Sequence, residues 1–153
     1  MSLLLRIILP VAAVIFALDR LSKVWIVEWL DLENRLAIDV FPPFLNFRMA
    51  WNTGINFGIA GGGDEWMRWV LIGLSVAISA ALLWWVLRRN ERTLALGAGA
   101  VIGGALGNAW DRFEYGAVAD FLNMSCCGIN NPFSFNIADI AIFAGAIWIA
   151  FRA

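Results

Sequence analysis

The segment LALGAGAVIGGALGNAWDR, residues 94–112, decides how this chain folds. Small residues recur there every four positions, which places them on one face of a helix that ends in an acid: Gly99, Gly103, Gly107 and Asp111. The adjacent row on the same helix consists of Ala100, Gly104 and Asn108. Such rows let helices approach closely inside a bilayer, where packing replaces the hydrophobic effect. The segment therefore predicts a tightly packed membrane helix with a polar end.

The rest of the chain has the composition of a membrane protein. Hydrophobic residues make up 61% of the 153 positions and charged residues only 15%, which is far from the balance of a water-soluble domain. We expect a single integral membrane domain over residues 1–153. The net charge of -1 leaves no basic stripe to neutralise phosphates, so no nucleic-acid partner is expected.

Four segments are apolar and near the length needed to cross a hydrocarbon core, about 20 helical residues. They lie at about residues 4–29, 66–87, 94–110 and 136–151, and predict an all-α membrane protein with four transmembrane helices. The first segment resembles a signal peptide. However, the polar stretch Asp19–Lys23 stands where a small-residue cleavage site is expected, so we predict a retained anchor.

Basic residues predict the orientation of these helices. Arg88, Arg89 and Arg92 lie between the second and third segments, and Arg6 and Arg152 lie near the two termini. Short loops rich in Lys and Arg face the cytoplasm, so both termini are expected there. The segments at about 31–65 and 112–134 then face outward.

The outward segment between the first two helices carries strand and turn signals, chiefly over residues 36–63. Residues 44–51 alternate loosely enough to predict a short strand after the turn at Pro42 and Pro43. Residues 55–59 lie between glycine-containing turns and predict a second short strand. We therefore expect a small extracytoplasmic β-element on the membrane surface.

Missing residues exclude several kinds of chemistry. The chain has no histidine, which excludes a Ser-His-Asp triad, a Cys-His pair and a His-based zinc site. Ser22 and Lys23 are neighbours and point about 100° apart on a helix, so they do not form a Ser-Lys dyad. Cys126 and Cys127 are adjacent and have no further Cys or His to complete a metal site. No cofactor and no metal are expected.

Carboxylates remain as candidates, and Asp120 and Asp139 are the best of them. Each lies where a strongly apolar helix meets a polar loop, and the connection over residues 112–134 brings both to one membrane face. A carboxylate at membrane depth is costly and is usually kept for a function. Two close carboxyl groups share a proton, so one can activate a water while the other polarises a carbonyl group. For Asp139 the structural alternative is stabilisation of a helix N-terminus.

The other polar residues near these ends suggest supporting roles. Asp19 and Lys23 lie four residues apart on one helix face and are expected to form an ion pair, and Asp111 is expected to pair with Arg112. The Asn108/Asp111 and Asn136/Asp139 pairs each lie three residues apart, so the members of each pair share a helix face.

At these residues the chain resembles the lipoprotein signal peptidases, bacterial signal peptidase II. The resemblance covers essentially the whole chain, and five sequence blocks occur in the family's order: DRLSK (19–23), NTGINF (52–57), GNAWDR (107–112), VADF (118–121) and FNIAD (135–139). Asn56 departs from the pattern, since many members carry a small residue there. This departure leaves the two blocks that carry Asp120 and Asp139 unchanged.

The resemblance implies an intramembrane aspartic endopeptidase of the bacterial cytoplasmic (inner) membrane, with its site toward the outer face. It implies that Asp120 and Asp139 are catalytic and that the enzyme cleaves prolipoproteins on the amino side of a diacylglyceryl-modified cysteine. Membrane lipid is the other expected partner, and no obligate protein partner is evident. The resemblance also implies residues that shape or support the substrate pocket: Asn52, Gly54, Asn108, Asp111, Arg112 and Asn136, with Asp19 and Lys23 in the first block.

Two other classes of function are compatible with part of the pattern. A proton relay would use the same acids but predicts carboxylates spaced across the bilayer, whereas these gather toward one face. A non-catalytic assembly subunit explains the glycine rows but not the clustered acids.

Overall fold

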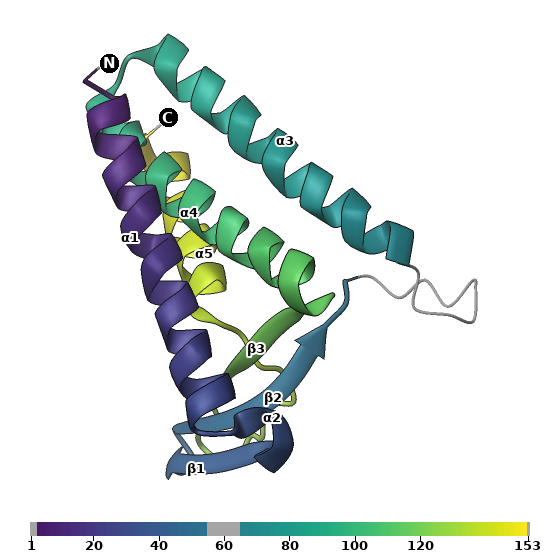
Figure 1. Ribbon diagram of the computed structural model, residues 1–153. Coiled ribbons are helices and arrows are strands. Elements are labelled where there is room, and N and C mark those ends of the chain that lie inside the picture. The colour runs from purple at the N-terminus through teal and green to yellow at the C-terminus, as the bar shows by residue number, and fades with distance from the viewer. Residues whose placement is uncertain (1–2, 55–64, 153) are drawn as a thin grey trace.

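Long helices build most of the molecule, and a small sheet caps one end (Figure 1). A computed structural model describes residues 3–54 and 65–152. Its helices are α1 (Leu5–Lys23), which continues as the π-helix η1 (Val24–Trp29), the short α2 (Leu32–Arg35), α3 (Glu65–Arg89), α4 (Arg92–Tyr115) and α5 (Ile137–Arg152). The four long helices lie at the four predicted segments, and α4 extends beyond its predicted end to Tyr115.

Two of the four long helices, α3 and α4, are long and apolar enough to cross a membrane by length and composition. The helix α1 carries Asp19, Arg20 and Lys23 in its second half, and α5 has only 16 residues. The charged residues set α1 apart from an uninterrupted span, and α5 is shorter than such a span. The fold is therefore mostly helical, and two of its helices have the full character of membrane spans.

The helix α4 lies between α1 and α5, and its glycines allow both contacts. A Cβ atom at Gly103 would lie 2.6 Å from the carbonyl oxygen of Ala12 in α1, and one at Gly104 would lie 2.5 Å from the carbonyl oxygen of Ala138 in α5. The two rows predicted for this segment therefore serve two different neighbours. Gly99 and Gly103 face α1, and Gly104 faces α5.

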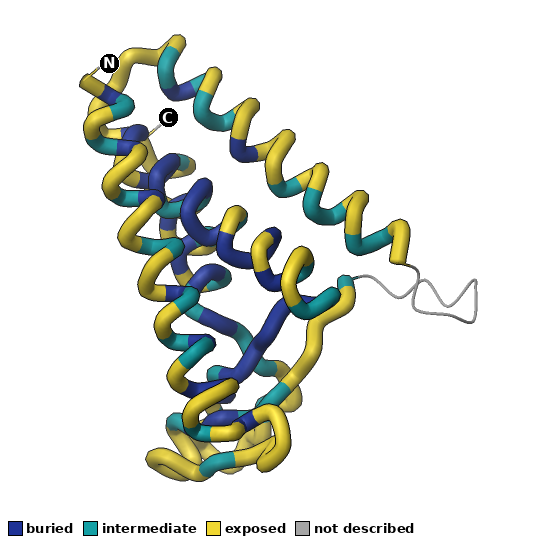
Figure 2. The backbone as a smooth tube through the Cα atoms, in the orientation of Figure 1, coloured by how far each residue is buried: buried dark blue, intermediate teal, exposed yellow. Residues whose placement is uncertain are grey.

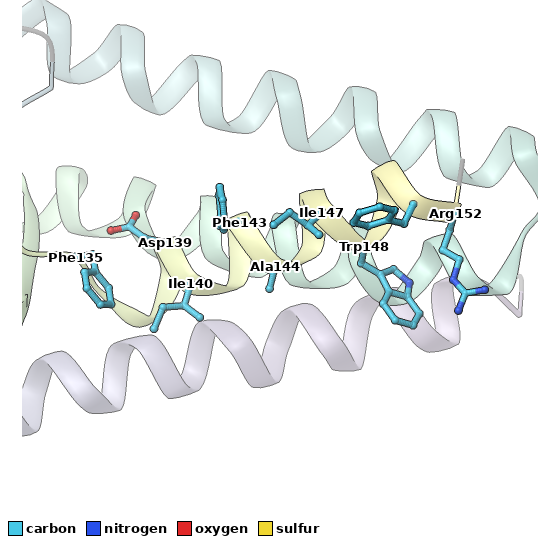
Figure 3. Close-up of a pocket in the computed structure, with 9 residues that line it drawn as sticks. Phe135, Asp139, Ile140, Phe143, Ala144, Ile147, Trp148 and Arg152 are labelled. Atoms are coloured by element: carbon cyan, nitrogen blue, oxygen red, sulfur yellow. The ribbon is translucent and has the colours of Figure 1, made fainter. Parts of the chain in front are cut away.

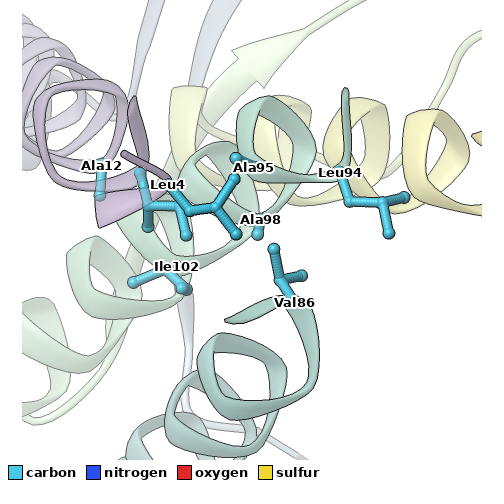
Figure 4. Close-up of a cluster of buried hydrophobic side chains, with 8 residues drawn as sticks. Leu4, Ala12, Val86, Leu94, Ala95, Ala98 and Ile102 are labelled. Atoms are coloured by element: carbon cyan, nitrogen blue, oxygen red, sulfur yellow. The ribbon is translucent and has the colours of Figure 1, made fainter. Parts of the chain in front are cut away.

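The helix α3 packs mainly against α4 and diverges from the other helices toward the sheet end (Figure 1). Most of its length is exposed, as the yellow turns of the tube show (Figure 2). Near the end of the bundle opposite the sheet, buried Val86 of α3 joins a cluster of apolar side chains (Figure 4). The cluster includes Leu4, which immediately precedes α1, and Leu94 and Ala98 of α4. This cluster closes the helical bundle at the end where α1 begins and α5 stops.

The sheet has three antiparallel strands in the order β1 (Ala37–Phe41), β2 (Leu45–Asn52) and β3 (Val118–Asn123). The strand predicted at residues 44–51 is confirmed as β2, and β1 lies within the predicted outer segment. The second predicted strand, residues 55–59, lies outside the described residues.

The connection at residues 112–134 was predicted as a loop, and this is wrong in its first half. The helix α4 continues to Tyr115, and β3 pairs with β2, with Asp120 opposite Ala50. The strand does not alternate, because Val118, Ala119, Asp120 and Phe121 are all buried. A strand buried on both faces lacks the period-two pattern by which sequence reveals strands.

Candidate active site

Asp120 lies in the middle of β3 and is almost fully buried, with 4% of its surface exposed. Both of its carboxylate oxygens accept hydrogen bonds from asparagine side chains. Asn136 Nδ2 donates to Oδ1 at 2.7 Å, and Asn52 Nδ2, at the end of β2, donates to Oδ2 at 3.2 Å. The strand fixes the backbone of this acid and the two amides fix its side chain.

Asp139 lies in the first turn of α5 and takes part in a reciprocal cap with Asn136. The Asp139 N–H donates to Asn136 Oδ1 at 2.9 Å, and the Asn136 N–H donates to Asp139 Oδ2 at 3.2 Å. The stabilisation of the helix N-terminus considered for Asp139 is therefore present. Its other oxygen, Oδ1, accepts a hydrogen bond from Asn108 Nδ2 of α4 at 2.9 Å.

Two amides connect the two acids. Asn136 Nδ2 also donates to Asn108 Oδ1 at 3.1 Å, which leaves Asn108 Nδ2 to bond Asp139. The path Asp120–Asn136–Asn108–Asp139 thus joins β3, α4 and α5 through hydrogen bonds alone. The structure brings together the two acids and all three asparagines selected from the sequence.

The environment of Asp120 favours a bound proton. Burial raises the pKa of its carboxyl group to about 7, and the negative charge of Asp139 acts in the same direction. The hydrogen bond from Asn52, the positive charge of Lys23 and the hydrogen bond from Asn136 oppose this shift. Asp120 therefore retains a proton close to neutral pH, as one member of a pair that shares a proton must.

A second charged cluster lies between α1 and α4. Lys23 Nζ contacts Asp19 Oδ2 and Asp111 Oδ2, each at 2.6 Å, and Arg20 Nη1 contacts Asp111 Oδ1 at 2.9 Å. The predicted Asp19–Lys23 ion pair is confirmed. The predicted Asp111–Arg112 pair is wrong, because Asp111 ends the glycine row that faces α1, where Lys23 and Arg20 lie. The sequence pattern did not indicate Arg20 as a partner.

Arg112 lies one position further around α4, where it interacts electrostatically with Asp120, Asp111 and Asp139. Its Nη1 donates to the carbonyl oxygen of Asn108 at 3.3 Å, while its buried Nε has no hydrogen-bond partner among the described residues. A buried donor without a partner costs free energy, so it is suited to receive an acceptor from a ligand.

Gly54 follows Asn52 by two residues and has a φ angle of +95°, which glycine adopts without strain. Its N–H donates to Asn52 Oδ1 at 3.0 Å. A Cβ atom at this position would lie 2.5 Å from Leu71 Cδ1 of α3. Gly54 therefore orients the Asn52 amide and allows α3 to approach.

A cavity of about 830 Å³ extends from this site along α5 (Figure 3). Asp139 lies at one end and Arg152 at the other, and apolar residues line the length between them: Phe135, Ile140, Phe143, Ala144, Ile147, Trp148 and Phe151. This groove was not predicted. Its signal in the sequence is the series of apolar residues at helical spacing along α5: Ile140, Phe143, Ala144, Ile147 and Phe151.

Cys126 and Cys127 are free and exposed. Over residues 3–54 and 65–152, no group of three or more His, Cys, Asp or Glu side chains is placed to hold a metal ion.

Comparisons with known proteins agree on one family. The profile of signal peptidase (SPase) II matches residues 11–153. The lipoprotein signal peptidase of Methylobacterium sp. (strain 4-46) is 39% identical over 137 residues, which are 90% of this chain and 82% of that protein. The lipoprotein signal peptidase of Caulobacter vibrioides is 40% identical over 136 residues, 88% of this chain and 79% of that protein.

Two solved structures share the fold of this chain. One described as a bacterial membrane enzyme, determined by the in meso method at 1.9 Å resolution, superposes with a TM-score of 0.79 and 25% identity. The alignment covers 95% of this chain and 90% of that one. A second structure with the same description, at 2.3 Å resolution, gives a TM-score of 0.76 and 26% identity over 95% of this chain and 85% of that one.

Proposed function

This chain belongs to the signal peptidase II family of aspartic peptidases, and we propose that Asp120 and Asp139 are the groups with which it cleaves prolipoproteins. The enzyme removes signal peptides from prolipoproteins on the amino side of the diacylglyceryl-modified cysteine. The observation that carries the assignment of the two acids is the path of hydrogen bonds through Asn136 and Asn108, which holds them in one site.

The two acids act as a pair with one proton between them. The ionised carboxylate takes a proton from a water molecule, which attacks the carbonyl carbon of the scissile bond. The protonated carboxyl group donates to the carbonyl oxygen as negative charge develops there. The raised pKa of Asp120 keeps this proton available near neutral pH.

The groove along α5 takes the apolar part of the substrate. Its walls are aromatic and aliphatic, and it ends at Asp139, where the scissile bond has to lie. Each acyl CH₂ group moved into such surroundings contributes about 0.8 kcal/mol. The buried Nε of Arg112, which has no partner within residues 3–54 and 65–152, donates to a carbonyl oxygen of the substrate close to the two acids.

We propose that all four long helices cross the bacterial cytoplasmic membrane as one domain. The polar half of α1 and the polar start of α5 would lie in the outer headgroup region, together with the sheet and the two acids. The first turn of α1 and the last turn of α5 lie at the opposite end of the bundle, which would face the cytoplasm (Figure 1). Arg88, Arg89 and Arg92, at the junction of α3 and α4, support this orientation.

A cleavage assay tests the assignment of the two acids. Purified enzyme is mixed with diacylglyceryl-modified prolipoprotein, and wild type is compared with Asp120→Asn and Asp139→Asn. Each variant is expected to lose at least about a thousandfold in kcat, since a pair with one member replaced cannot both activate water and protonate the carbonyl oxygen.

The matched control is Asp39→Asn, which removes an exposed acid of β1 that pairs with Arg48. It is expected to leave cleavage unchanged, and a precursor without the diacylglyceryl group should not be processed. Near-normal cleavage by either site variant would refute the assignment. Collapse of a proton gradient by wild type, without cleavage, would favour a relay.

A further inference from the structure

Lys23 is buried but takes no part in the proposed chemistry. Only 1% of its side chain is exposed, and its ammonium group lies between Asp19 and Asp111, which are both fully buried. Both contacts measure 2.6 Å. Replacing a buried ion pair by apolar residues is often neutral or stabilising, so stability alone is a weak reason for placing three charges here.

The other hydrogen bonds of these two acids lead to the active site. Asp19 Oδ1 accepts the N–H of Ala138 at 3.0 Å, and Asp111 Oδ2 accepts the N–H of Ala119 at 3.1 Å. Ala138 immediately precedes Asp139, and Ala119 immediately precedes Asp120. Through one carboxylate on each side, a single ammonium group is therefore linked to the backbone next to each of the two acids.

Close packing makes these links short. A Cβ atom at Gly107 of α4 would lie 2.7 Å from Asp19 Oδ2, so only glycine leaves room for that carboxylate. Arg20 holds the second oxygen of Asp111 at 2.9 Å. Neither Asp19 nor Asp111 can therefore rotate away from Lys23 without losing other contacts.

We infer that Lys23 is a positioning residue for the cleavage reaction. By binding Asp19 and Asp111 together, it sets the position of β3 relative to the start of α5, and with it the separation of Asp120 and Asp139. This rests on the proposed function of the two acids. Misplacing reacting groups by about 1 Å can cost about a hundredfold in rate, so such a device has a large effect on kcat.

The first test is Lys23→Met, which keeps most of the side-chain volume and removes the charge. We expect kcat, measured per folded molecule, to fall at least tenfold, while KM for the diacylglyceryl-modified precursor changes less than twofold. We also expect a changed pH–kcat profile, because the electrostatic environment of Asp120 depends on the positive charge of Lys23 and on the distance between Asp120 and Asp139. A purely structural role would lower the folded fraction and leave the shape of this profile unchanged.

Ile8→Ala is the control for lost stability, since Ile8 is buried in α1 at the end opposite the active site. It is expected to lower the thermal midpoint with an unchanged kcat per folded molecule. If Lys23→Met does not fold, the double variant Asp19→Asn/Lys23→Met replaces it. That variant has no unpaired charge, because Asp111 keeps Arg20, and the amide introduced by Asp19→Asn keeps an acceptor oxygen for the Ala138 N–H.

A wild-type kcat and an unchanged pH profile in either folded variant would overturn the inference. A rise in KM with an unchanged kcat would also overturn it. These results differ from failure of the proposed function, in which the Asp120→Asn or Asp139→Asn enzyme itself keeps cleaving the precursor.

Discussion

Asn136 has more hydrogen bonds to the site than any other single residue described above. Its Nδ2 reaches Asp120 and Asn108, and its Oδ1 accepts the N–H of Asp139. Asn136→Ala leaves these groups without partners, at about 1–3 kcal/mol, so we expect kcat to fall about tenfold to a hundredfold. Steady-state cleavage kinetics measure this loss.

The matched control for Asn136 is Asn123→Ala. Asn123 is also a buried asparagine, but its amide holds the carbonyl oxygens of Asn131 and Phe133 in the loop after β3. It is expected to lower stability with little effect on kcat. Equal kinetic losses in the two variants would contradict a specific role for Asn136.

Asp120 also makes stability depend on pH. Its pKa is about 7 in the folded protein and about 3.9 in an unfolded chain, so between these values the folded state binds a proton that the unfolded state has released. Stability from this group is therefore greatest below about pH 4 and falls as pH rises toward 7. Asp120→Asn removes this loss of folding stability, because an amide does not titrate in this range.

At pH 8 we expect the inactive Asp120→Asn enzyme to unfold at a higher temperature than wild type, by at least about 2 °C, which corresponds to about 1 kcal/mol in a chain of this size. Near pH 4 the unfolding temperatures of wild type and Asp120→Asn should converge. Thermal unfolding in detergent at both pH values measures the difference. A constant difference, or a less stable variant at pH 8, would contradict the raised pKa.

At the scale of the elements, α4 is the part on which the site is assembled. It contacts α1 through one row of small residues and α5 through the other, so its helix faces determine where Asp111 and Asn108 lie. Gly104→Ala brings a Cβ atom to 2.5 Å from the carbonyl oxygen of Ala138, next to Asp139. We expect a stability loss of about 1–3 kcal/mol and a lower kcat.

Gly73→Ala in α3 is the matched control, because nothing lies within 4 Å of a Cβ atom there. It is expected to be neutral or to stabilise by up to about 1 kcal/mol, since alanine favours a helix. Thermal midpoints and kcat values of Gly104→Ala and Gly73→Ala measure the difference between the two positions. A tolerated Gly104→Ala would show that α4 and α5 can separate without harm.

The side of α5 that lines the groove gives a second prediction at this scale. Ala144 lines the groove, and Ala144→Trp should obstruct the apolar part of the substrate and raise KM at least tenfold. Ala150 is also exposed on α5 but does not line the groove, so Ala150→Trp is the control with an unchanged KM. A KM that both substitutions change alike would place the substrate elsewhere.

For the whole molecule, the proposed orientation predicts which residues are accessible from each side of the membrane. The exposed Cys126 and Cys127 should react with a membrane-impermeant thiol reagent added from the outer side. Glu91→Cys, in a background with both natural cysteines replaced by serine, should react only after the membrane is opened, because Glu91 lies between α3 and α4. The reverse pattern would invert the topology.

The sequence predicted the long helices and the two glycine rows, because both depend on local composition and helical periodicity. Asp120 and Asp139 were selected because carboxylates beside apolar helices are costly and a chain without histidine has few alternatives. Three features depended on contacts between distant segments and were not predictable in this way. They are β3, the pairing of Asp111 with Lys23 and Arg20, and the groove along α5.

The groove has one consequence for how the enzyme meets its substrate. Phe143 and Phe151 line it and remain 71% and 86% exposed, so the groove is open on the side of α5 that bears these two residues. In a membrane this face would border lipid, and substrate would arrive by diffusion in the plane of the bilayer. The rate would then follow the number of substrate molecules per lipid rather than per volume. Adding inert lipid or detergent at constant total protein should slow cleavage by surface dilution.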